Sequence, residues 1–280
     1  MKETGSEMKK ERRYETREDV SAAKRYIRRE ISWSTVRKPL SLLLALFVWH
    51  LLTTYQVPLF TQVPKPIEVM KDAINFVPTT TYWTHVLYSN QRVLAGFFIA
   101  LIIGVPLGLM MGYKKLFNEW TFPIFEILRP IPPIAWLPLS VIMFPTPEMS
   151  VIYLIFIGAF FPIVMNTVLG VLSIEENYRR SALSLGASPR DIFRHIILPA
   201  STPSIFTGML IGAGMTWDMV VAAEMVAGGY GLGYMTWDAY VVINYPRIIF
   251  GMISIGLCGF ILSSVVRFIG NKIMPWRRLF

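Results

Sequence analysis

The fold of this chain is decided by a run without a single charged residue: Val151-Ile-Tyr-Leu-Ile-Phe-Ile-Gly-Ala-Phe-Phe-Pro-Ile-Val-Met-Asn-Thr-Val-Leu-Gly-Val-Leu-Ser-Ile174. A helix needs about 20 apolar residues to cross the ~30 Å of hydrocarbon in a bilayer, and this run is long enough. We predict five further crossings of similar character, at residues 40–60, 92–113, 123–144, 204–227 and 248–269. The sequence therefore predicts an all-α integral membrane protein with six transmembrane helices.

The composition of the whole chain supports this class. Of its 280 residues, 54% are hydrophobic and 16% are charged, whereas ordinary soluble domains carry about 25% charge. The aromatic content of 14% and the long apolar runs exclude intrinsic disorder. The single cysteine, Cys258, excludes a disulfide-bonded scaffold.

The basic residues gather on one side of the predicted crossings. The net charge is +9, and 22 of the 27 Lys and Arg residues share the side of the N-terminus if the segments alternate. The positive-inside rule then predicts a multi-pass protein of the cell (inner or plasma) membrane with both termini cytoplasmic. We divide the chain into a basic tail (1–38) with an amphipathic helix over 19–32, a membrane domain (39–273) and a cytoplasmic end (274–280). We expect the tail to contact membrane lipid rather than nucleic acid.

Glycines and prolines modify two of the crossings. In the second, Gly104, Gly108 and Gly112 are four residues apart, which predicts a seam of close helix packing. The third contains Leu128-Arg-Pro-Ile-Pro-Pro-Ile-Ala-Trp-Leu-Pro138, whose prolines remove backbone hydrogen bonds. This stretch is either a bent helix beside a translocation path or a kink shaped only by packing. Before the second crossing, residues 63–76 predict a short interfacial helix on the outer side.

The fifth crossing contains two carboxylates, Asp218 and Glu224. A carboxylate at the bilayer centre costs ~2.5–3.5 kcal/mol on insertion scales, so each should face a bundle interior, a cavity or an interface. Their spacing puts them on different helix faces, which excludes a paired acid–base site. Glu224 either lines a path or pairs with a partner subunit, and Asp218 either lines a path or caps a helix near the membrane edge. The path candidates are Arg129, Pro132, Trp136, Trp217, Asp218 and Glu224.

Motifs for catalysis are missing from the sequence. It contains no G-x-x-x-x-G-K-[ST] phosphate loop and no nucleophile elbow. The three histidines, His50, His85 and His195, are too isolated for a metal site to be assembled by spacing. The glycine-rich run over 228–234 lacks the dinucleotide-binding spacing, and we interpret it as a flexible outer loop. We therefore expect neither an enzyme nor a cofactor in this chain.

The predicted cytoplasmic loop over 175–203 is the most informative segment. It begins Glu175-Glu-Asn-Tyr-Arg-Arg-Ser-Ala-Leu-Ser-Leu-Gly-Ala-Ser-Pro-Arg-Asp-Ile-Phe-Arg-His-Ile-Ile-Leu-Pro199 and splits into two short helices. Gly186 is a typical residue for the end of the first. Ser188 as N-cap and Asp191 three positions later are close to a capping box for the second, which we expect Pro199 to stop.

The second of these helices has an apolar face edged by two arginines: Ile192, Phe193, Ile196 and Ile197, with Arg190 and Arg194. Such a face either docks into a groove on another protein or folds against the protein's own membrane helices.

The loop resembles the EAA loop of permease subunits from binding-protein-dependent ABC importers, where a glycine follows a helical Glu-Ala-Ala run and precedes Ile-x-Leu-Pro. This chain has Ala182, Gly186 and Ile196-Ile-Leu-Pro199, but Arg180 and Ser181 stand where the family usually has Glu and Ala. Four further stretches resemble the nitrate/sulfonate/taurine/bicarbonate branch: Val63-Pro-Lys-Pro-Ile-Glu-Val69, Arg129-Pro-Ile-Pro-Pro-Ile-Ala-Trp-Leu-Pro138, Gly158-Ala-Phe-Phe-Pro-Ile163, and Ala222-Ala-Glu-Met225 with Gly231-Leu-Gly233.

The resemblance implies the type I importer permease fold and a translocation path for a small anion or organosulfonate, of the nitrate, sulfonate/taurine or bicarbonate class. It implies a second permease subunit, expected to be a copy of this chain, and an extracytoplasmic solute-binding protein. It also implies two cytoplasmic ATP-binding subunits, which would carry the ATP and magnesium. The residues expected to couple those subunits to the path are Ala182, Leu185, Gly186, Ala187, Ser188, Arg190, Asp191, Ile192, Phe193, Arg194 and Pro199.

Two other functions fit the residues. An ion-gradient-driven secondary transporter would use Asp218 or Glu224 as a proton carrier and predicts an internal repeat, which the two halves do not show. A non-transporting membrane scaffold would recruit a cytoplasmic protein through the 175–203 loop and would not link substrate to ATP hydrolysis.

Overall fold

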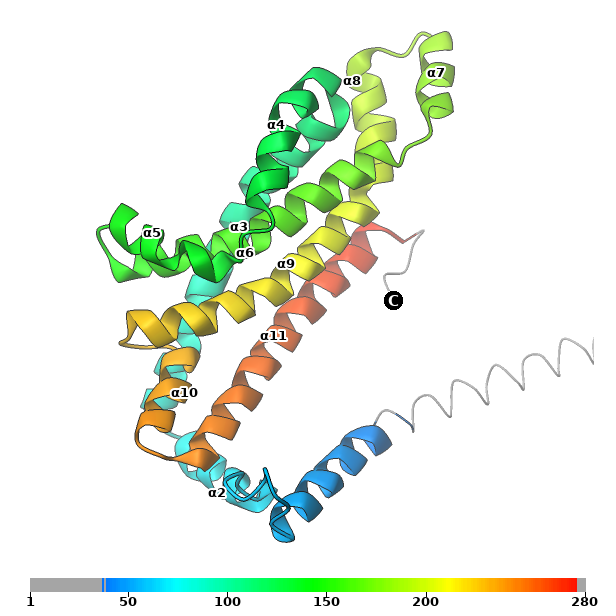
Figure 1. Ribbon diagram of the computed structural model, residues 1–280. Coiled ribbons are helices and arrows are strands. Elements are labelled where there is room, and N and C mark those ends of the chain that lie inside the picture. Colours follow the sequence, from blue (N-terminus) through cyan, green and yellow to red (C-terminus); the bar gives the residue numbers. More distant parts are fainter. Residues whose placement is uncertain (1–36, 38, 276–280) are drawn as a thin grey trace, which may run out of the picture. The chain divides into compact units, whose positions relative to one another are not determined.

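The computed structural model describes residue 37 and residues 39–275, which form helices and no strand (Figure 1). The chain divides into two compact units, residues 1–68 and 69–280, and each is described by itself. The amphipathic helix predicted over 19–32 and the last five residues of the predicted cytoplasmic end lie outside the described residues.

The described part of the first unit contains an apolar helix, Pro39–Thr54. It ends earlier than the crossing predicted over 40–60, because Gln56 has a φ of 47° and Pro58 disfavours helical backbone at the residue before it. The predicted end at residue 60 is therefore wrong. The described helix is shorter than the ~20 residues of a full span.

Four helices of the second unit are long and apolar enough to cross a membrane: α3 (Thr80–Tyr113), α6 (Pro147–Leu172), a continuous helix Pro189–Ala227 and α11 (Tyr245–Ile273). They contain the predicted second, fourth, fifth and sixth crossings. The helix that contains the crossing predicted over 92–113 begins earlier, where the Thr79 hydroxyl accepts a hydrogen bond from the Tyr82 N–H.

The predicted third crossing is a bent pair rather than one straight helix. α4 (Lys115–Leu128) is followed by a 3₁₀ turn, η1 (Pro133–Trp136), and by α5 (Leu137–Met143), and the two parts meet at 92°. Pro130, Pro132 and Pro133 lie at the break and have no N–H to continue a helical hydrogen-bond ladder. The predicted bend in the crossing over 123–144 is confirmed, and the two parts together are long and apolar enough for one broken span.

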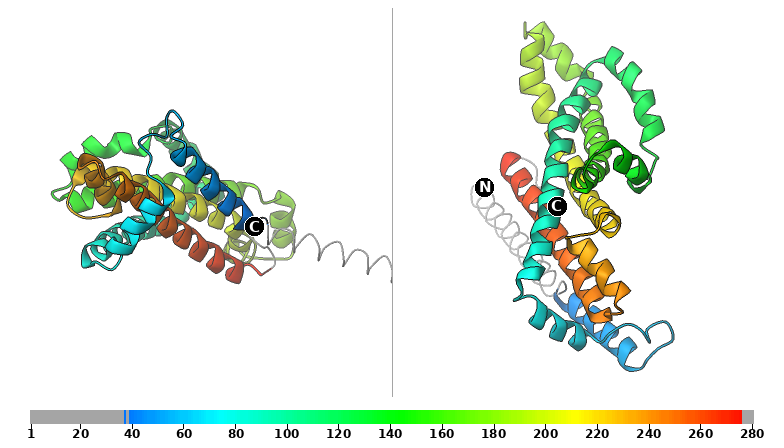
Figure 2. Two further views of the ribbon diagram at one scale, coloured as in Figure 1. Left: turned by 90° about the horizontal axis from the view of Figure 1, so that it is seen from below. Right: turned by 90° about the vertical axis from the view of Figure 1, so that its left-hand side faces the viewer.

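The centre of the second unit is built from α3, α6 and α9 (Leu198–Ala227), and α6 packs along both of the others (Figures 1 and 2). Their shared faces bury residues with almost no exposed surface, such as Val93 on α3, Ile155 on α6 and Val220 on α9. α10 (Leu232–Val241) packs against α9 and α11. This core fixes the relative positions of every polar group described below.

The amphipathic stretch predicted over 63–76 forms α2 (Pro66–Phe76). Asp72 accepts two hydrogen bonds from Arg247 of α11, at 2.7 and 2.8 Å, and the Arg247 guanidinium lies 3.6 Å from the centre of the Phe76 ring. Ile67, Met70 and Ile74 remain exposed. The ion pair holds α2 to the start of α11.

The glycine seam predicted in the second crossing is confirmed, and its partner is α6 of the same chain. A Cβ added at Gly108 would lie 2.6 Å from Thr167 Cβ and 2.8 Å from the Val164 carbonyl oxygen, and one at Gly112 would lie 2.5 Å from Val171 Cβ. Residues that advance along α3 meet residues that advance along α6, so the two helices run parallel.

Replacing Gly108 with alanine should therefore destabilise the protein. The new methyl group would meet the α6 backbone, which cannot rotate away, and overpacking of this kind costs about 1–3 kcal/mol. The matched control is Gly256→Ala in α11, where a Cβ meets nothing within 4 Å and helix propensity favours alanine. Thermal unfolding of the purified protein in detergent should show a lower Tm for Gly108→Ala alone. Equal melting temperatures for both variants would contradict the seam.

Candidate functional site

The loop between α6 and α9 contains α7 (Glu176–Ser184) and a tight turn at Gly186. The Gly186 N–H donates to the Leu183 carbonyl at 2.9 Å, and the Ala187 N–H donates to the Ala182 carbonyl at 3.0 Å. This is a Schellman motif, and it requires the φ of +82° that Gly186 adopts. The predicted end of the first loop helix is confirmed.

The second loop helix starts as predicted but does not stop as predicted. Ser188 and Asp191 form the full capping box at the start of α8 (Pro189–Ile192). A π-helical turn, η2 (Phe193–Ile197), then leads into α9, so Pro199 lies inside one continuous helix, Pro189–Ala227. The wider turn accommodates the proline, because the Leu198 N–H donates to the Phe193 carbonyl five residues back.

The apolar face of this second helix packs against the protein's own membrane helices. Ile192 and Ile197 are 3% and 5% exposed, in a cluster with Leu109 of α3 and Val171 of α6. The Phe193 ring meets the Tyr113 ring edge-on at 5.6 Å between centroids. The intrachain contacts favour the second of the two interpretations left open by the sequence, while Phe193 and Ile196 are only partly buried and docking of the loop on another protein stays a prediction.

The surface that the loop leaves free lies on the other side, around α7 and its turn. Leu185 is 88% exposed, and Tyr178 and Leu183 are exposed as well. Arg190 and Arg194, on the start of the continuous helix, are also exposed. The loop lies at one end of the α6–α9 pair (Figure 1). Its exposed surface combines these apolar side chains with two arginines.

The six path candidates do not form one surface of the chain. Arg129, Pro132 and Asp218 are exposed, whereas Trp136 and Trp217 pack in or against the same hydrophobic cluster. Asp218 lies inside α9, so the predicted role as a helix cap is wrong. The remaining candidate, Glu224, is completely buried within the chain.

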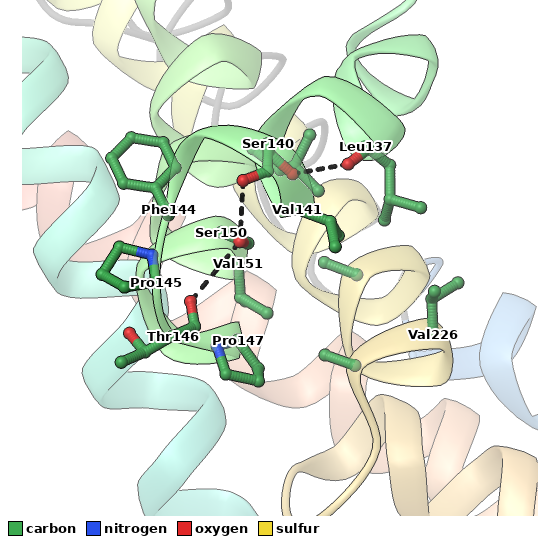
Figure 3. Close-up of a pocket in the computed structure, with 13 residues that line it drawn as sticks. Leu137, Ser140, Val141, Phe144, Pro145, Thr146, Pro147, Ser150, Val151 and Val226 are labelled. Atoms are coloured by element: carbon green, nitrogen blue, oxygen red, sulfur yellow. Dashed lines mark hydrogen bonds between the residues drawn. The ribbon is translucent and has the colours of Figure 1, made fainter.

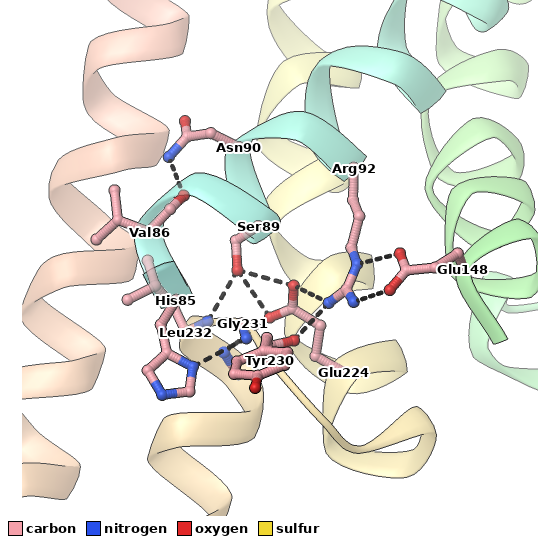
Figure 4. A network of polar contacts seen from close by, with 11 residues as sticks. His85, Val86, Ser89, Asn90, Arg92, Glu148, Glu224, Tyr230, Gly231 and Leu232 are labelled. Atoms are coloured by element: carbon pink, nitrogen blue, oxygen red, sulfur yellow. Dashed lines mark hydrogen bonds and ion pairs between the residues drawn. The ribbon is translucent and has the colours of Figure 1, made fainter. Parts of the chain in front are cut away.

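Glu224 is the centre of a buried polar network (Figure 4). Its carboxylate accepts hydrogen bonds from the Ser89 hydroxyl at 2.8 Å, the Gly233 N–H at 2.9 Å and the Arg92 guanidinium at 2.9 Å. Burial of a charge is tolerable when it is paired and hydrogen-bonded in this way. The predictions that Glu224 lines a path or pairs with another subunit do not hold for this arrangement, since its partners are in the same chain.

Arg92 links this network to the start of α6. Besides Glu224, its guanidinium donates to the Tyr230 carbonyl at 2.6 Å and to both carboxylate oxygens of Glu148, where the Nε–Oε2 distance is 2.7 Å. Arg92 is only 5% exposed, whereas the Glu148 side chain is 51% exposed. One arginine therefore joins α3, α6 and α9 through two carboxylates that differ sharply in solvent access.

The glycine-rich run after α9 is held by the same group of residues. The Gly231 N–H donates to His85 Nδ1 at 3.0 Å, and the Leu232 N–H donates to the Ser89 hydroxyl at 2.8 Å. Gly231 has a φ of +131°, and a side chain there would collide with the Glu224 carboxyl group. The flexible loop predicted over 228–234 is corrected, since it ends in the helical start of α10 and is tied to α3.

Sequence reasoning missed Arg92 because it placed this residue at the edge of a crossing. A signal was present in the sequence: Glu224 in the fifth crossing needs a positively charged partner, and Arg92 lies near the predicted outer end of the second crossing.

A separate cavity of about 410 Å³ lies between α5, α6 and α9 (Figure 3). Its hydroxyls are already bonded within the chain, Ser150 to the Ser140 carbonyl at 3.0 Å, and none of the path candidates lines it.

The sequence of this chain is similar to a known family of membrane transport proteins. The family described as binding-protein-dependent transport system inner membrane component matches residues 104–278. The chain is 41% identical over 240 residues to a putative ABC transporter permease protein of Methanocaldococcus jannaschii, covering 84% of this chain and 90% of that protein. It is 35% identical over 254 residues to the nitrate import permease protein NrtB of Leptolyngbya laminosa, covering 86% and 90%.

One more permease and one solved structure of an ABC transporter are also similar to this chain. The chain is 35% identical over 243 residues to the taurine transport system permease protein TauC of Escherichia coli, covering 84% of this chain and 88% of that protein. A structure of the MetNI methionine ABC transporter in an inward-facing conformation matches with a TM-score of 0.55 at 20% identity, covering 69% of this chain and 96% of that chain. At that identity the structural match shows a shared fold.

The two carboxylates that hold Arg92 should contribute very differently to stability. Glu224→Ala removes the fully buried partner of a buried guanidinium, and breaking a buried pair costs about 3–5 kcal/mol. Glu148→Ala removes a partner whose side chain is 51% exposed, so water can take the place of its carboxylate at Arg92 and the cost is smaller. Melting temperatures of the two purified variants should therefore separate clearly, with Glu224→Ala far lower. An equal decrease of Tm in both variants would contradict the expectation that the Arg92–Glu148 pair contributes less to stability than the Arg92–Glu224 pair.

Proposed function

Since this chain belongs to the binding-protein-dependent transport system inner membrane components, as an ABC transporter permease of the branch that includes the nitrate and taurine permeases, we propose that it imports a small oxyanion or organosulfonate. The observation that supports this substrate class is the alignment over most of both chains with permeases named for nitrate and for taurine. Bicarbonate belongs to the same chemical class.

The proposed assembly contains two copies of this permease, two cytoplasmic ATP-binding subunits and an extracytoplasmic solute-binding protein. ATP and magnesium belong to the ATP-binding subunits in this proposal. The membrane subunit supplies the path, and both of its termini are expected to lie in the cytoplasm of a cell with an inner or plasma membrane.

Coupling to the ATP-binding subunits is proposed to use the exposed side of the α6–α9 loop. Leu185, Leu183 and Tyr178 offer apolar contacts, and Arg190 and Arg194 offer positive charge beside them. Arg190 and Arg194 lie on the continuous helix Pro189–Ala227, whereas α7 and Leu185 join that helix through the turn at residues 185–188. A partner that binds both parts of the surface can therefore move α9 through Arg190 and Arg194, which suits alternating access.

The secondary-transporter alternative is weakened by the environment of Glu224. A proton carrier must release and rebind its proton from water along a path, whereas Glu224 is 0% exposed and is held by Arg92, Ser89 and Gly233. Asp218 is exposed on α9 and makes no ion pair with another described residue.

Leu185→Glu should uncouple transport from ATP hydrolysis. The substitution puts a charge on a side chain that is 88% exposed in the free subunit and is proposed to be covered by the partner. Purified complexes in nanodiscs should lose most of the substrate-stimulated ATPase activity, while the Tm of the permease stays unchanged. Leu185→Met is the matched control and should retain the stimulation.

Phe193→Asp is the contrasting variant for the same loop. Because Phe193 packs on Tyr113 inside the chain, its replacement should lower the Tm of the isolated permease as well as the activity. A Leu185→Glu complex with full stimulation would refute the proposed docking surface.

Substrate class is tested by uptake into proteoliposomes that contain the permease, its ATP-binding subunits and its binding protein. We expect ATP-dependent uptake of at least one of nitrate, bicarbonate, taurine or an alkanesulfonate, and none of methionine. Binding assays on the cognate binding protein with the same compounds identify which one. Uptake that needs no ATP but stops when an ion gradient is dissipated would instead support the secondary transporter.

A further inference from the structure

Arg92 presents two different faces to its partners (Figure 4). One face is fixed, because its NH1 group is bound to Glu224 and to the Tyr230 carbonyl, both at hydrogen-bonding distance inside the chain. The other face is the fork formed by Nε and NH2, and both of these groups donate to the Glu148 carboxylate. The fork is therefore a preformed site that binds two oxygens of one anion.

Glu148, which occupies this fork, has fewer hydrogen bonds than Glu224. Glu224 accepts additional hydrogen bonds from Ser89 and Gly233, whereas Glu148 makes no other side-chain hydrogen bond with the described residues. The Glu148 side chain is 51% exposed, and it covers an arginine that is 5% exposed. Removal of Glu148 from the fork opens Arg92 to the solvent on that side.

Movement of the Glu148 side chain, rather than of a helix, is the available way to open this fork. α3 and α6 are in backbone contact, since a Cβ on Gly96 would lie 2.6 Å from Ile155 Cγ2. Gly104 and Gly108 continue this close contact further along α3. The two helices therefore stay together, and the glutamate side chain can rotate away from the first turn of α6 without moving either of them.

We propose that the Nε–NH2 fork of Arg92 is a binding site for the transported oxyanion, and that Glu148 occupies this fork when no substrate is present. The inference rests on the function proposed above. A guanidinium fork matches the two oxygens that carboxylate, nitrate, bicarbonate and sulfonate groups all present. Exchange of Glu148 for another anion at Nε and NH2 leaves the NH1 contacts to Glu224 and to the Tyr230 carbonyl in place, so the buried Arg92–Glu224 pair stays intact.

The test uses the purified permease in detergent and sodium nitrate as the probe. Glu148→Ala empties the fork without removing a buried group, so nitrate no longer competes with the glutamate. Thermal stabilisation by nitrate should reach its half-maximum at a concentration about tenfold lower than in the wild type. Sodium chloride should not reproduce this shift, because chloride carries the charge but lacks two oxygens. Asp238→Ala, which removes an exposed carboxylate from α10 and leaves Arg92 untouched, should behave like the wild type.

A second variant tests the fork itself. Glu148→Ala combined with Arg92→Lys keeps the positive charge but replaces the fork by a single ammonium group, and the preference for nitrate over chloride should disappear. If that double variant does not fold, the nitrate and chloride titrations of Glu148→Ala decide alone.

The outcomes are distinct. An unchanged nitrate dependence in Glu148→Ala, or an equal effect of chloride, would overturn the proposed site and leave Arg92 as a structural residue. A tenfold shift in that variant, combined with a wild-type complex that imports no oxyanion, would support the fork as an anion site and overturn the proposed substrate class instead.

Discussion

Direct backbone contact between α3 and α6 is the constraint on which the rest of the structure depends. Gly108 and Gly112 leave no room for a side chain against Thr167 and Val171, so the two helices have a single register. That register carries Arg92 to the start of α6 and opposite Glu224 of α9. A carboxylate can be fully buried at this position because helix packing brings Arg92 and Ser89 to it and the Gly233 N–H donates a further hydrogen bond.

The two ends of this core are held by different physical means. Near Arg92, hydrogen bonds and charge tie α3 to α9 and to the glycine run before α10. At the loop end, apolar contacts of Ile192 and Ile197 with α3 and α6 serve the same purpose. The Arg92 end also contains the apolar cluster of Val93, Ile155 and Val220, so it combines directional hydrogen bonds with close packing.

Local signals in the sequence were sufficient for features that depend on neighbouring residues. The capping box at Ser188, the turn at Gly186 and the proline break after α4 were all predictable, because each is set by a few adjacent residues. The orientation of the Ile192 face was not, since a stripe of apolar residues is identical whether it meets its own chain or another. The Arg92–Glu224 pair joins residues far apart in the sequence and follows only from the helix register.

The π turn before Pro199 has a consequence for the helix that contains it. A π turn holds about one residue more than an α turn, and one residue corresponds to roughly 100° of rotation about the helix axis. The helical repeat of the side chains in α8 is therefore out of step with that of α9, although both belong to one continuous helix. Substitutions can accumulate on the loop-facing stripe without shifting the stripe that packs in the core. Loss of one residue from Phe193–Ile197 would let this turn close into an ordinary α turn, which removes the extra room that the Pro199 ring has in the wider turn.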